Sequence, residues 1–187
     1  MKKFIISISI IILLIAGVCS AVVVNYLSNT ISAIVTISSP VVINEIGYRG
    51  PPKEEFVELY NRGSVAIDLN HWRIQDNHEE DILVPFSEGE STTISAGGYA
   101  VITATADETD VVVPEGVVHL STGDKKIGNG LADGSDIVIL KSPDGNTMDQ
   151  KEFFKNPCKG EGKEKHSYQK INGDWKCREP SPGASNI

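Results

Sequence analysis

After residue 40, apolar positions recur with the two-residue period of β-strands and not with the spacing of helices. In the run EFVELYN, Val57 and Leu59 fall on one strand face and Glu58 falls on the other. Comparable short runs are VVINEI, HWRIQD, GGYAVITA, GVVHLS, SDIVILKS and HSYQKI. Gly, Pro, Asp and Asn interrupt the chain about every ten residues, as in all-β domains. We therefore expect an all-β fold, either an antiparallel β-sandwich or a barrel.

The stretch SPDGNTMD predicts one turn in more detail. It separates two strand-like runs, and Asp144 with Gly145 can adopt the positive φ angles that tight hairpin turns require. We therefore expect a β-hairpin at this point of the chain.

The N-terminus follows a different pattern. Lys2 and Lys3 precede an almost unbroken apolar run from Phe4 to Val24, whose 21 positions match the length of about 20 residues that crosses a bilayer as a helix. Residues 1–24 are therefore expected to form an apolar helix that serves as a signal peptide or as a membrane anchor. Either role places the rest of the chain outside the cytoplasm, so the protein is secreted or is anchored in the membrane facing outward.

Residues 25–38 are rich in Ser, Thr and Asn with alternating Ile and Val, which predicts a linker or a first edge strand. The formal net charge of the whole chain is −8. Because an acidic surface repels phosphate groups, we do not expect nucleic acid as a partner. Contact with the membrane is expected only through the N-terminal segment.

Cys158 and Cys177 form an even pair in a chain expected to be exported, which favours a disulfide between them. Such a bridge would stabilise the fold by about 3 kcal/mol in the chain-entropy description. Two unbridged buried thiols are the alternative. A zinc site is disfavoured because His166 is the only histidine close to them in the sequence.

The stretch NEIGYRGPPKEEFVELYN brings together four carboxylates, which are Glu45, Glu54, Glu55 and Glu58. Alternation places Glu55 and Glu58 on opposite faces of one strand, where they cannot share a proton or a metal ion. Glu45, on the preceding strand, can lie beside Glu58. We expect these acids at exposed or edge positions, with a structural role as acceptors of hydrogen bonds from backbone or arginine donors.

We expect no metal site. The best candidate by residue type is DNHEED, which offers Asp76, Glu79, Glu80 and Asp81. These oxygen ligands suit calcium, but the glycine-bearing spacing of an EF-hand loop is missing. We expect a solvated acidic loop, with weak calcium binding as the alternative. No Gly-x-Ser-x-Gly elbow and no phosphate-binding loop occurs in the sequence.

In chain order, the landmarks VVINEI, EFVELYNRGSVAIDLNHWRIQD, ISAGGYAVIT, LADGSDIVILKSPDGNTMD, SYQKINGDW and PSPGASN resemble a lamin-tail domain of the prokaryotic type. The resemblance covers residues 39–187 and rests on the order and spacing of the motifs. It implies an immunoglobulin-like antiparallel β-sandwich over these residues.

The positions that match the family's motif are Asn44, Glu45, Glu58, Asn61, Leu69, Trp72, Gly98, Pro182 and Gly183. Asn61 lies just before Gly63, where an Asn side chain can close a turn against its own backbone. Trp72 is expected to fill one end of the sandwich. Pro182 and Gly183 match the family's closing motif and would end the domain.

The resulting hypothesis is a non-catalytic, exported or cell-surface domain that binds a protein or another cell-surface macromolecule. One alternative is a structural surface or fibre subunit that assembles by strand addition through residues 25–40. A second alternative is an accessory module of an extracellular hydrolase. No cofactor is expected apart from the weak calcium candidate.

Overall fold

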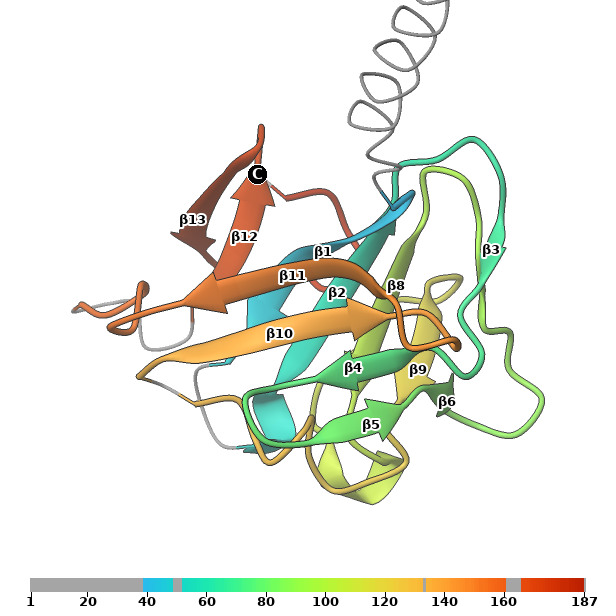
Figure 1. Ribbon diagram of the computed structural model, residues 1–187, viewed down its shortest axis with the longest axis horizontal. Helices are drawn as coiled ribbons and strands as arrows, with labels where there is room; N and C mark the ends of the chain where they lie inside the picture. Colours follow the sequence, from blue (N-terminus) through green and yellow to red (C-terminus); the bar gives the residue numbers. More distant parts are fainter. Residues whose placement is uncertain (1–38, 49–51, 133, 161–165, 187) are drawn as a thin grey trace, which may run out of the picture. The chain divides into compact units, whose positions relative to one another are not determined.

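The computed structural model describes residues 39–48, 52–132, 134–160 and 166–186 (Figure 1). The chain divides into two units, Met1–Ser38 and Ser39–Ile187, and the description concerns the second. The helix predicted at residues 1–24 and the linker or edge strand predicted at 25–38 lie outside the described residues. Within the described ranges, no helix is long and apolar enough to span a membrane.

The described part is built almost entirely of β-strands. Its strands are β1 (Val41–Gly47), β2 (Phe56–Asn61), β3 (Ile67–Asp68), β4 (Arg73–Gln75), β5 (Glu80–Ile82), β6 (Val84–Pro85), β7 (Thr93–Ile94), β8 (Tyr99–Thr103), β9 (Val118–Ser121), β10 (Asp136–Lys141), β11 (Thr147–Phe153), β12 (Ser167–Ile171) and β13 (Asp174–Arg178). Two single-turn 3-10 helices, η1 (Pro52–Glu54) and η2 (Ala106–Glu108), lie in connections. This content confirms the all-β prediction.

Two sheets form the layers of a sandwich. The larger has the order β13-β12-β1-β2-β8-β9-β6 and the smaller has the order β11-β10-β4-β5, while β3 and β7 form a separate short pair. Figure 1 shows the smaller sheet crossing the face of the larger one in front of β1, β2 and β8. The sandwich prediction is therefore confirmed, and a closed barrel is excluded because each sheet has its own edge strands.

The strand ladders are antiparallel with one exception, β8 with β9, which pair in parallel. The prediction of a wholly antiparallel sandwich is wrong at this pair. Residues 104–117 separate the two strands, and a connection of more than a dozen residues is long enough to return the chain to the same end of the sheet.

A β-bulge in β1 decides which way its side chains point. Ile43 lies opposite Leu59 and Glu45 lies opposite Glu58, so Asn44 is the extra residue in the ladder. The bulge shifts the alternation by one residue. As a result, Ile43 and Ile46 both join the core between the sheets although they are three positions apart. Glu45 consequently lies on the outer face of the large sheet, away from the small sheet.

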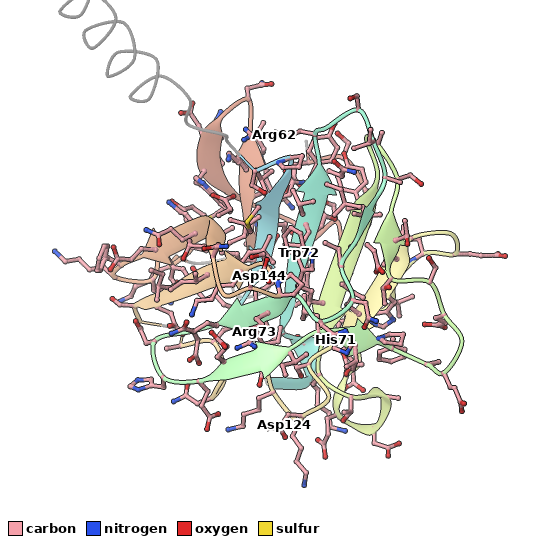
Figure 2. The ribbon with its side chains drawn as sticks, turned by 45° about the vertical axis from the view of Figure 1, so that its right-hand side comes forward. Arg62, His71, Trp72, Arg73, Asp124 and Asp144 are labelled. Atoms are coloured by element: carbon pink, nitrogen blue, oxygen red, sulfur yellow. A yellow bond between two sulfur atoms is a disulfide. The ribbon has the colours of Figure 1, made fainter. Side chains whose placement is uncertain are left out.

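Trp72, which was expected to pack inside the sandwich, belongs to the core that both sheets enclose (Figure 2), and so does Leu69. The predicted hairpin is also present, joining β10 to β11. At its tip Gly145 has a φ of 81°, and the Gly145 amide donates a hydrogen bond to the Ser142 carbonyl over 2.9 Å. Asp144 precedes it at the exposed end of the hairpin (Figure 2).

Candidate functional site

Glu45 and Glu58 lie directly opposite each other on β1 and β2. The prediction that Glu45 lies beside Glu58 is confirmed. The prediction that these acids occupy exposed or edge positions is confirmed for Glu54, which is exposed. It is wrong for Glu45 and Glu58, since β1 and β2 are interior strands and both side chains are 0% exposed. Glu55, just before β2, is buried as well. Glu45 and Glu58 are buried because a segment from the C-terminus covers the outer face of the large sheet at this point. Glu55 instead accepts the Leu131 amide through Oε2 over 3.2 Å.

That cover, residues 179–186, is called the closing segment here. The Ser181 amide and hydroxyl donate to Glu45 Oε1 and Oε2, each over 3.0 Å. The Gly183 amide donates to Glu58 Oε2 over 2.6 Å. At the end of the segment, Asn186 donates through Nδ2 to the Asn44 carbonyl over 2.9 Å. The predicted structural role as acceptors of backbone hydrogen bonds therefore holds for both glutamates.

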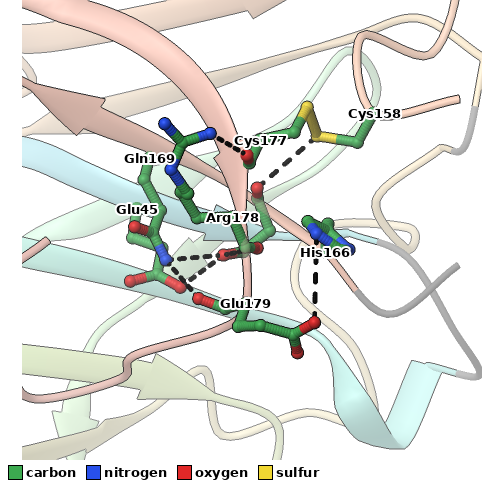
Figure 3. Close-up of polar contacts among 8 residues, drawn as sticks. Glu45, Cys158, His166, Gln169, Cys177, Arg178 and Glu179 are labelled. Atoms are coloured by element: carbon green, nitrogen blue, oxygen red, sulfur yellow. Dashed lines mark hydrogen bonds and ion pairs between the residues drawn. A yellow bond between two sulfur atoms is a disulfide. The ribbon is translucent and has the colours of Figure 1, made fainter. Parts of the chain in front are cut away.

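The remaining donors come from the sheet itself. Asn44 Nδ2 donates to Glu58 Oε1 and the Ser167 hydroxyl donates to Glu45 Oε1, both over 2.6 Å. Gln169 Nε2 supports this arrangement by donating to Ser167 Oγ over 3.1 Å and to the Glu179 carbonyl over 2.7 Å (Figure 3). Each of the four carboxylate oxygens thus accepts at least one hydrogen bond, as buried polar atoms require.

Burial raises the pKa of Glu58 from 4.5 to about 8. The hydrogen bond from Asn44 opposes this rise, whereas the nearby charge of Glu45 adds to it. Glu58 is therefore mostly protonated at neutral pH. A protonated carboxyl group is what general acid catalysis needs, but this one has no exposed surface and lies under the closing segment. A substrate could reach it only if that segment left.

Cys158 and Cys177 form a disulfide with a Cα–Cα distance of 5.4 Å, so the predicted bridge is confirmed and the alternative of unbridged thiols is wrong. The bridge joins the loop after β11 to the edge strand β13 (Figure 3). Since β13 runs directly into the closing segment, the disulfide also anchors the strand from which that segment starts.

The acidic loop matches the prediction of a solvated loop at residues 77–80, which are exposed, and differs from it at Asp76 and Asp81. Asp76 is 1% exposed, and its Oδ1 accepts the amides of His78 and Glu79 over 2.7 Å each. Its Oδ2 accepts the Asn129 amide over 2.8 Å. Asp81 accepts the Gly128 amide over 2.6 Å, and burial raises the pKa of Asp81 to about 6. These two aspartates fasten the loop that precedes β10 and so have a structural role.

The other two calcium candidates point elsewhere. Glu80 forms ion pairs of 2.6 Å with Arg73 and with Lys141, and Glu79 is exposed. Arg73 lies on β4, beside the edge strand β5 (Figure 2). In the ranges that the structure covers, no three His, Cys, Asp or Glu side chains are arranged to hold a metal ion. The four candidates are therefore not brought together as ligands.

Two further motif positions close turns. Asn61 is fully buried and donates through Nδ2 to the Val65 carbonyl over 2.8 Å, while its Oδ1 accepts the Gly63 amide over 3.0 Å. This is the turn closure expected of Asn61. Gly98 donates its amide to the Ser95 carbonyl over 2.9 Å, and a Cβ atom there would lie 3.1 Å from that oxygen.

His119 also has a structural environment. Its ring stacks on Phe86 with 3.6 Å between centroids, and its Nε2 lies 2.9 Å from Thr103 Oγ1. Burial lowers the pKa of His119, so the ring is neutral at neutral pH. It borders a hollow of about 510 Å³ between Glu90 and Val117.

Sequence reasoning missed a groove of about 340 Å³ beside the closing segment. It is lined by Gly47, Glu54, Phe56, Asp110, Val111, Val112, His166, Ser167, Glu179, Pro180 and Pro182. These residues come from the end of β1, η1, the start of β2, the loop after η2, the start of β12 with the residue before it, and the closing segment. No spacing along the chain links them, so no sequence signal pointed to the groove.

Sequence reasoning also missed an aromatic cluster next to the edge strand β13. Tyr168 and Trp175 lie 5.1 Å apart between ring centroids. Lys151 Nζ lies 5.1 Å from the first ring and 5.0 Å from the second, within the range of cation–π attraction. β13 has β12 as its neighbour on one side and is the outermost strand of the large sheet. This corner combines aromatic surface with a strand edge.

Comparison with known proteins identifies the family to which this fold belongs. The family model described as Lamin Tail Domain matches residues 35–154, which is more than half of the chain. The match spans β1 to β11, so β12, β13 and the closing segment lie beyond it. No curated protein matches the chain. The immunoglobulin-like sandwich described above is the fold of this family, and the chain belongs to the lamin tail domain family.

Proposed function

We propose that the chain is a non-catalytic, exported immunoglobulin-like domain that binds another protein. The observation that carries the proposal is the burial of Glu45 and Glu58, the acid pair best placed for acid–base chemistry. Both carboxylates are hydrogen-bonded to the closing segment, so they stabilise the fold and are out of reach of a substrate. Membership of a family of immunoglobulin-like, non-catalytic domains supports the same conclusion.

Export is supported by two independent features. The apolar run from Phe4 to Val24 follows two lysines, and the disulfide between Cys158 and Cys177 suits an oxidising compartment. In this proposal residues 1–24 are a signal peptide or an anchor, residues 25–38 are a linker or an added strand, and residues 39–187 are the binding domain. N-terminal sequencing of the mature protein distinguishes a cleaved signal from a retained anchor.

The binding role is tested on cells that produce the full chain. A photo-crosslinking amino acid replaces Lys176, which is exposed on the edge strand β13, or Glu88, which is exposed in a loop of the opposite part of the large sheet. We expect a discrete protein adduct at one of these positions and not at both. A uniform smear at both positions, or no adduct at either, would contradict the proposal.

The non-catalytic part has its own test. Purified protein is assayed for turnover of nucleic acid and of phosphoesters, beside the variants Glu45→Gln and Glu58→Gln. We expect no turnover by any of the three. Turnover by the wild type that either variant abolishes would replace this proposal with a hydrolytic function.

Assembly by strand addition is the second candidate, and the edge strand β13 favours it. Its outer edge has no strand beside it in the described part, and such an edge is a template for a further strand. Within residues 25–38, apolar and polar side chains alternate from Val35 to Ser38, as in an added strand. Size-exclusion chromatography of residues 25–187 against residues 39–187 tests this candidate, because polymer should form with the longer chain alone.

A further inference from the structure

The groove beside the closing segment combines an apolar wall with an acidic rim. Phe56 is buried beneath it, and Val112, whose side chain is 82% exposed, stands at its margin with Pro180 and Pro182. An exposed valine beside two prolines is apolar surface that remains in contact with water. Such surface favours a contact that covers it.

The rim carries three carboxylates, those of Glu54, Asp110 and Glu179. None of the described residues that line the groove is a lysine or an arginine. His166 Nε2 lies 3.9 Å from Glu179 Oε1, and the Glu179 side chain remains 82% exposed. Lys53, adjacent to Glu54 in the sequence, instead donates to the Asp107 carbonyl over 3.0 Å. Among the described residues, none of these three carboxylates forms a salt bridge with a lysine or an arginine.

We infer that this groove binds a basic segment of a partner protein in which arginine or lysine side chains alternate with apolar ones. The aliphatic stems of such side chains can pack on Val112 and the two prolines while their charged ends meet the carboxylates. A volume of about 340 Å³ is at the low end of ligand pockets, so it admits side chains and not a folded surface. The same charge disfavours phosphate-bearing ligands.

The groove is also preformed. One wall is the closing segment, which Ser181 fixes to Glu45 and Gly183 fixes to Glu58. The disulfide at Cys177 holds the strand that leads into it. Because little ordering is needed on this side, less of the interaction free energy is lost on binding. The inference rests on the proposed function, since it names the chemistry of the partner for which that function calls.

The test uses the full chain and a defined probe, a fluorescein-labelled hexapeptide of alternating arginine and valine. A second peptide carries citrulline, the neutral isostere of arginine, at the same positions. Fluorescence anisotropy at low salt should show saturable binding of the arginine peptide and at least tenfold weaker binding of the citrulline peptide, as expected when a charge-assisted contact is lost (about 1.4 kcal/mol per tenfold change).

Matched charge reversals then locate the binding. The double variant Asp110→Lys with Glu179→Lys should bind the arginine peptide at least tenfold more weakly. Glu88→Lys with Asp144→Lys changes the net charge equally at exposed positions outside the groove and should stay within twofold of the wild type. Val112→Arg, a single change at an exposed wall residue, should also weaken binding of the arginine peptide. It tests the groove if the first double variant does not fold.

Three results of the binding measurements would overturn the inference. They are the absence of saturable binding, an equal loss in both double variants, and dimerisation of the chain that Asp110→Lys with Glu179→Lys abolishes. The last result would identify a second copy as the occupant. A crosslinked adduct that the groove variants leave unchanged would exclude the groove as the binding site and would still support the proposed function. Peptide binding without any adduct on cells would contradict the proposed function and would still support the specificity of the groove for a basic peptide.

Discussion

Glu45 and Glu58 face each other across β1 and β2, and both are sealed under a segment that follows them by more than a hundred residues. In the described part of the chain, neither forms an ion pair with a lysine or an arginine. Hydrogen bonds from Asn44, Ser167, Ser181 and Gly183 surround them instead. A buried acid pair without a basic partner makes the fold sensitive to pH.

The first prediction concerns that sensitivity. Burial raises the pKa of Glu58 from 4.5 to about 8, so between these values the folded protein retains a proton that the unfolded chain releases. The stability from this proton is complete below pH 4.5 and is lost as the pH rises through 8. Urea unfolding from roughly pH 5 to pH 9 should show the free energy of unfolding fall by on the order of a few kcal/mol.

Glu58→Gln isolates the cause of this slope. A glutamine keeps an oxygen for the Gly183 amide, and its own amide can donate to Asn44 once the Asn44 side chain turns over. The variant should therefore fold. Its free energy of unfolding should show little of the decline that the wild type shows between pH 5 and pH 8, which is about the range that the shifted pKa sets. Glu88→Gln, at an exposed position, should keep the wild-type slope. An unchanged slope in Glu58→Gln would refute the assignment.

Local patterns in the sequence were sufficient for much of the fold. Alternation around Val57 and Leu59 identified β2, and Gly145 identified the hairpin between β10 and β11. The adjacency of Glu45 and Glu58 also followed, because their two strands are consecutive in the chain. The disulfide followed from an even number of cysteines after the N-terminal segment and the expected compartment.

What the sequence could not supply depends on contacts between distant segments. Ser181 lies 136 residues from Glu45, and Gly183 lies 125 residues from Glu58, so no periodicity shows that the acids are covered. Asp76 was expected in solvent for the same reason, since its third donor, the Asn129 amide, is 53 residues away. A short polar run has the same composition whether it is solvated or is closed over by another loop.

The second prediction concerns the disulfide. Replacing Cys158 and Cys177 together with alanine should lower the free energy of unfolding by about 3 kcal/mol, because the 19-residue separation sets the loop entropy released on unfolding. Urea unfolding of the wild type and of the double variant measures the difference. A reducing agent should lower the free energy of unfolding of the wild type towards that of the variant, and it should leave the value for the variant unchanged. Equal stability of the oxidised wild type and the double variant would contradict the prediction.

The third prediction separates a structural role of Asp76 from calcium binding. Asp76→Ala leaves three backbone amides without their acceptor and should cost on the order of 2 kcal/mol, whereas Glu79→Ala, at an exposed position, should cost little. Calcium should leave the Tm of the wild type nearly unchanged, since these oxygens already accept amides. A calcium-dependent rise in Tm above about 5 °C would instead make this loop a cation site.

The fourth prediction tests the fit of the closing segment with two glycines that share one backbone conformation. Gly183 has a φ of 82° and Gly145 a φ of 81°, so alanine introduces a similar backbone strain of about 1–2 kcal/mol at each. Only at Gly183 would the new Cβ also meet neighbours, at 2.9 Å from Pro114 Cδ and from Val117 Cγ2. Nothing lies within 4 Å of a Cβ at Gly145.

Gly183→Ala should therefore be more destabilising than Gly145→Ala in urea unfolding. The excess reports the displacement of the closing segment, because the Gly183 amide must move away from Glu58 to relieve the contact. Limited proteolysis should cut Gly183→Ala faster than Gly145→Ala near the C-terminus. Equal losses of stability in the two variants would contradict this prediction. They would mean that the closing segment can move without a loss of stability and that its contacts with Glu45 and Glu58 do not stabilise the fold.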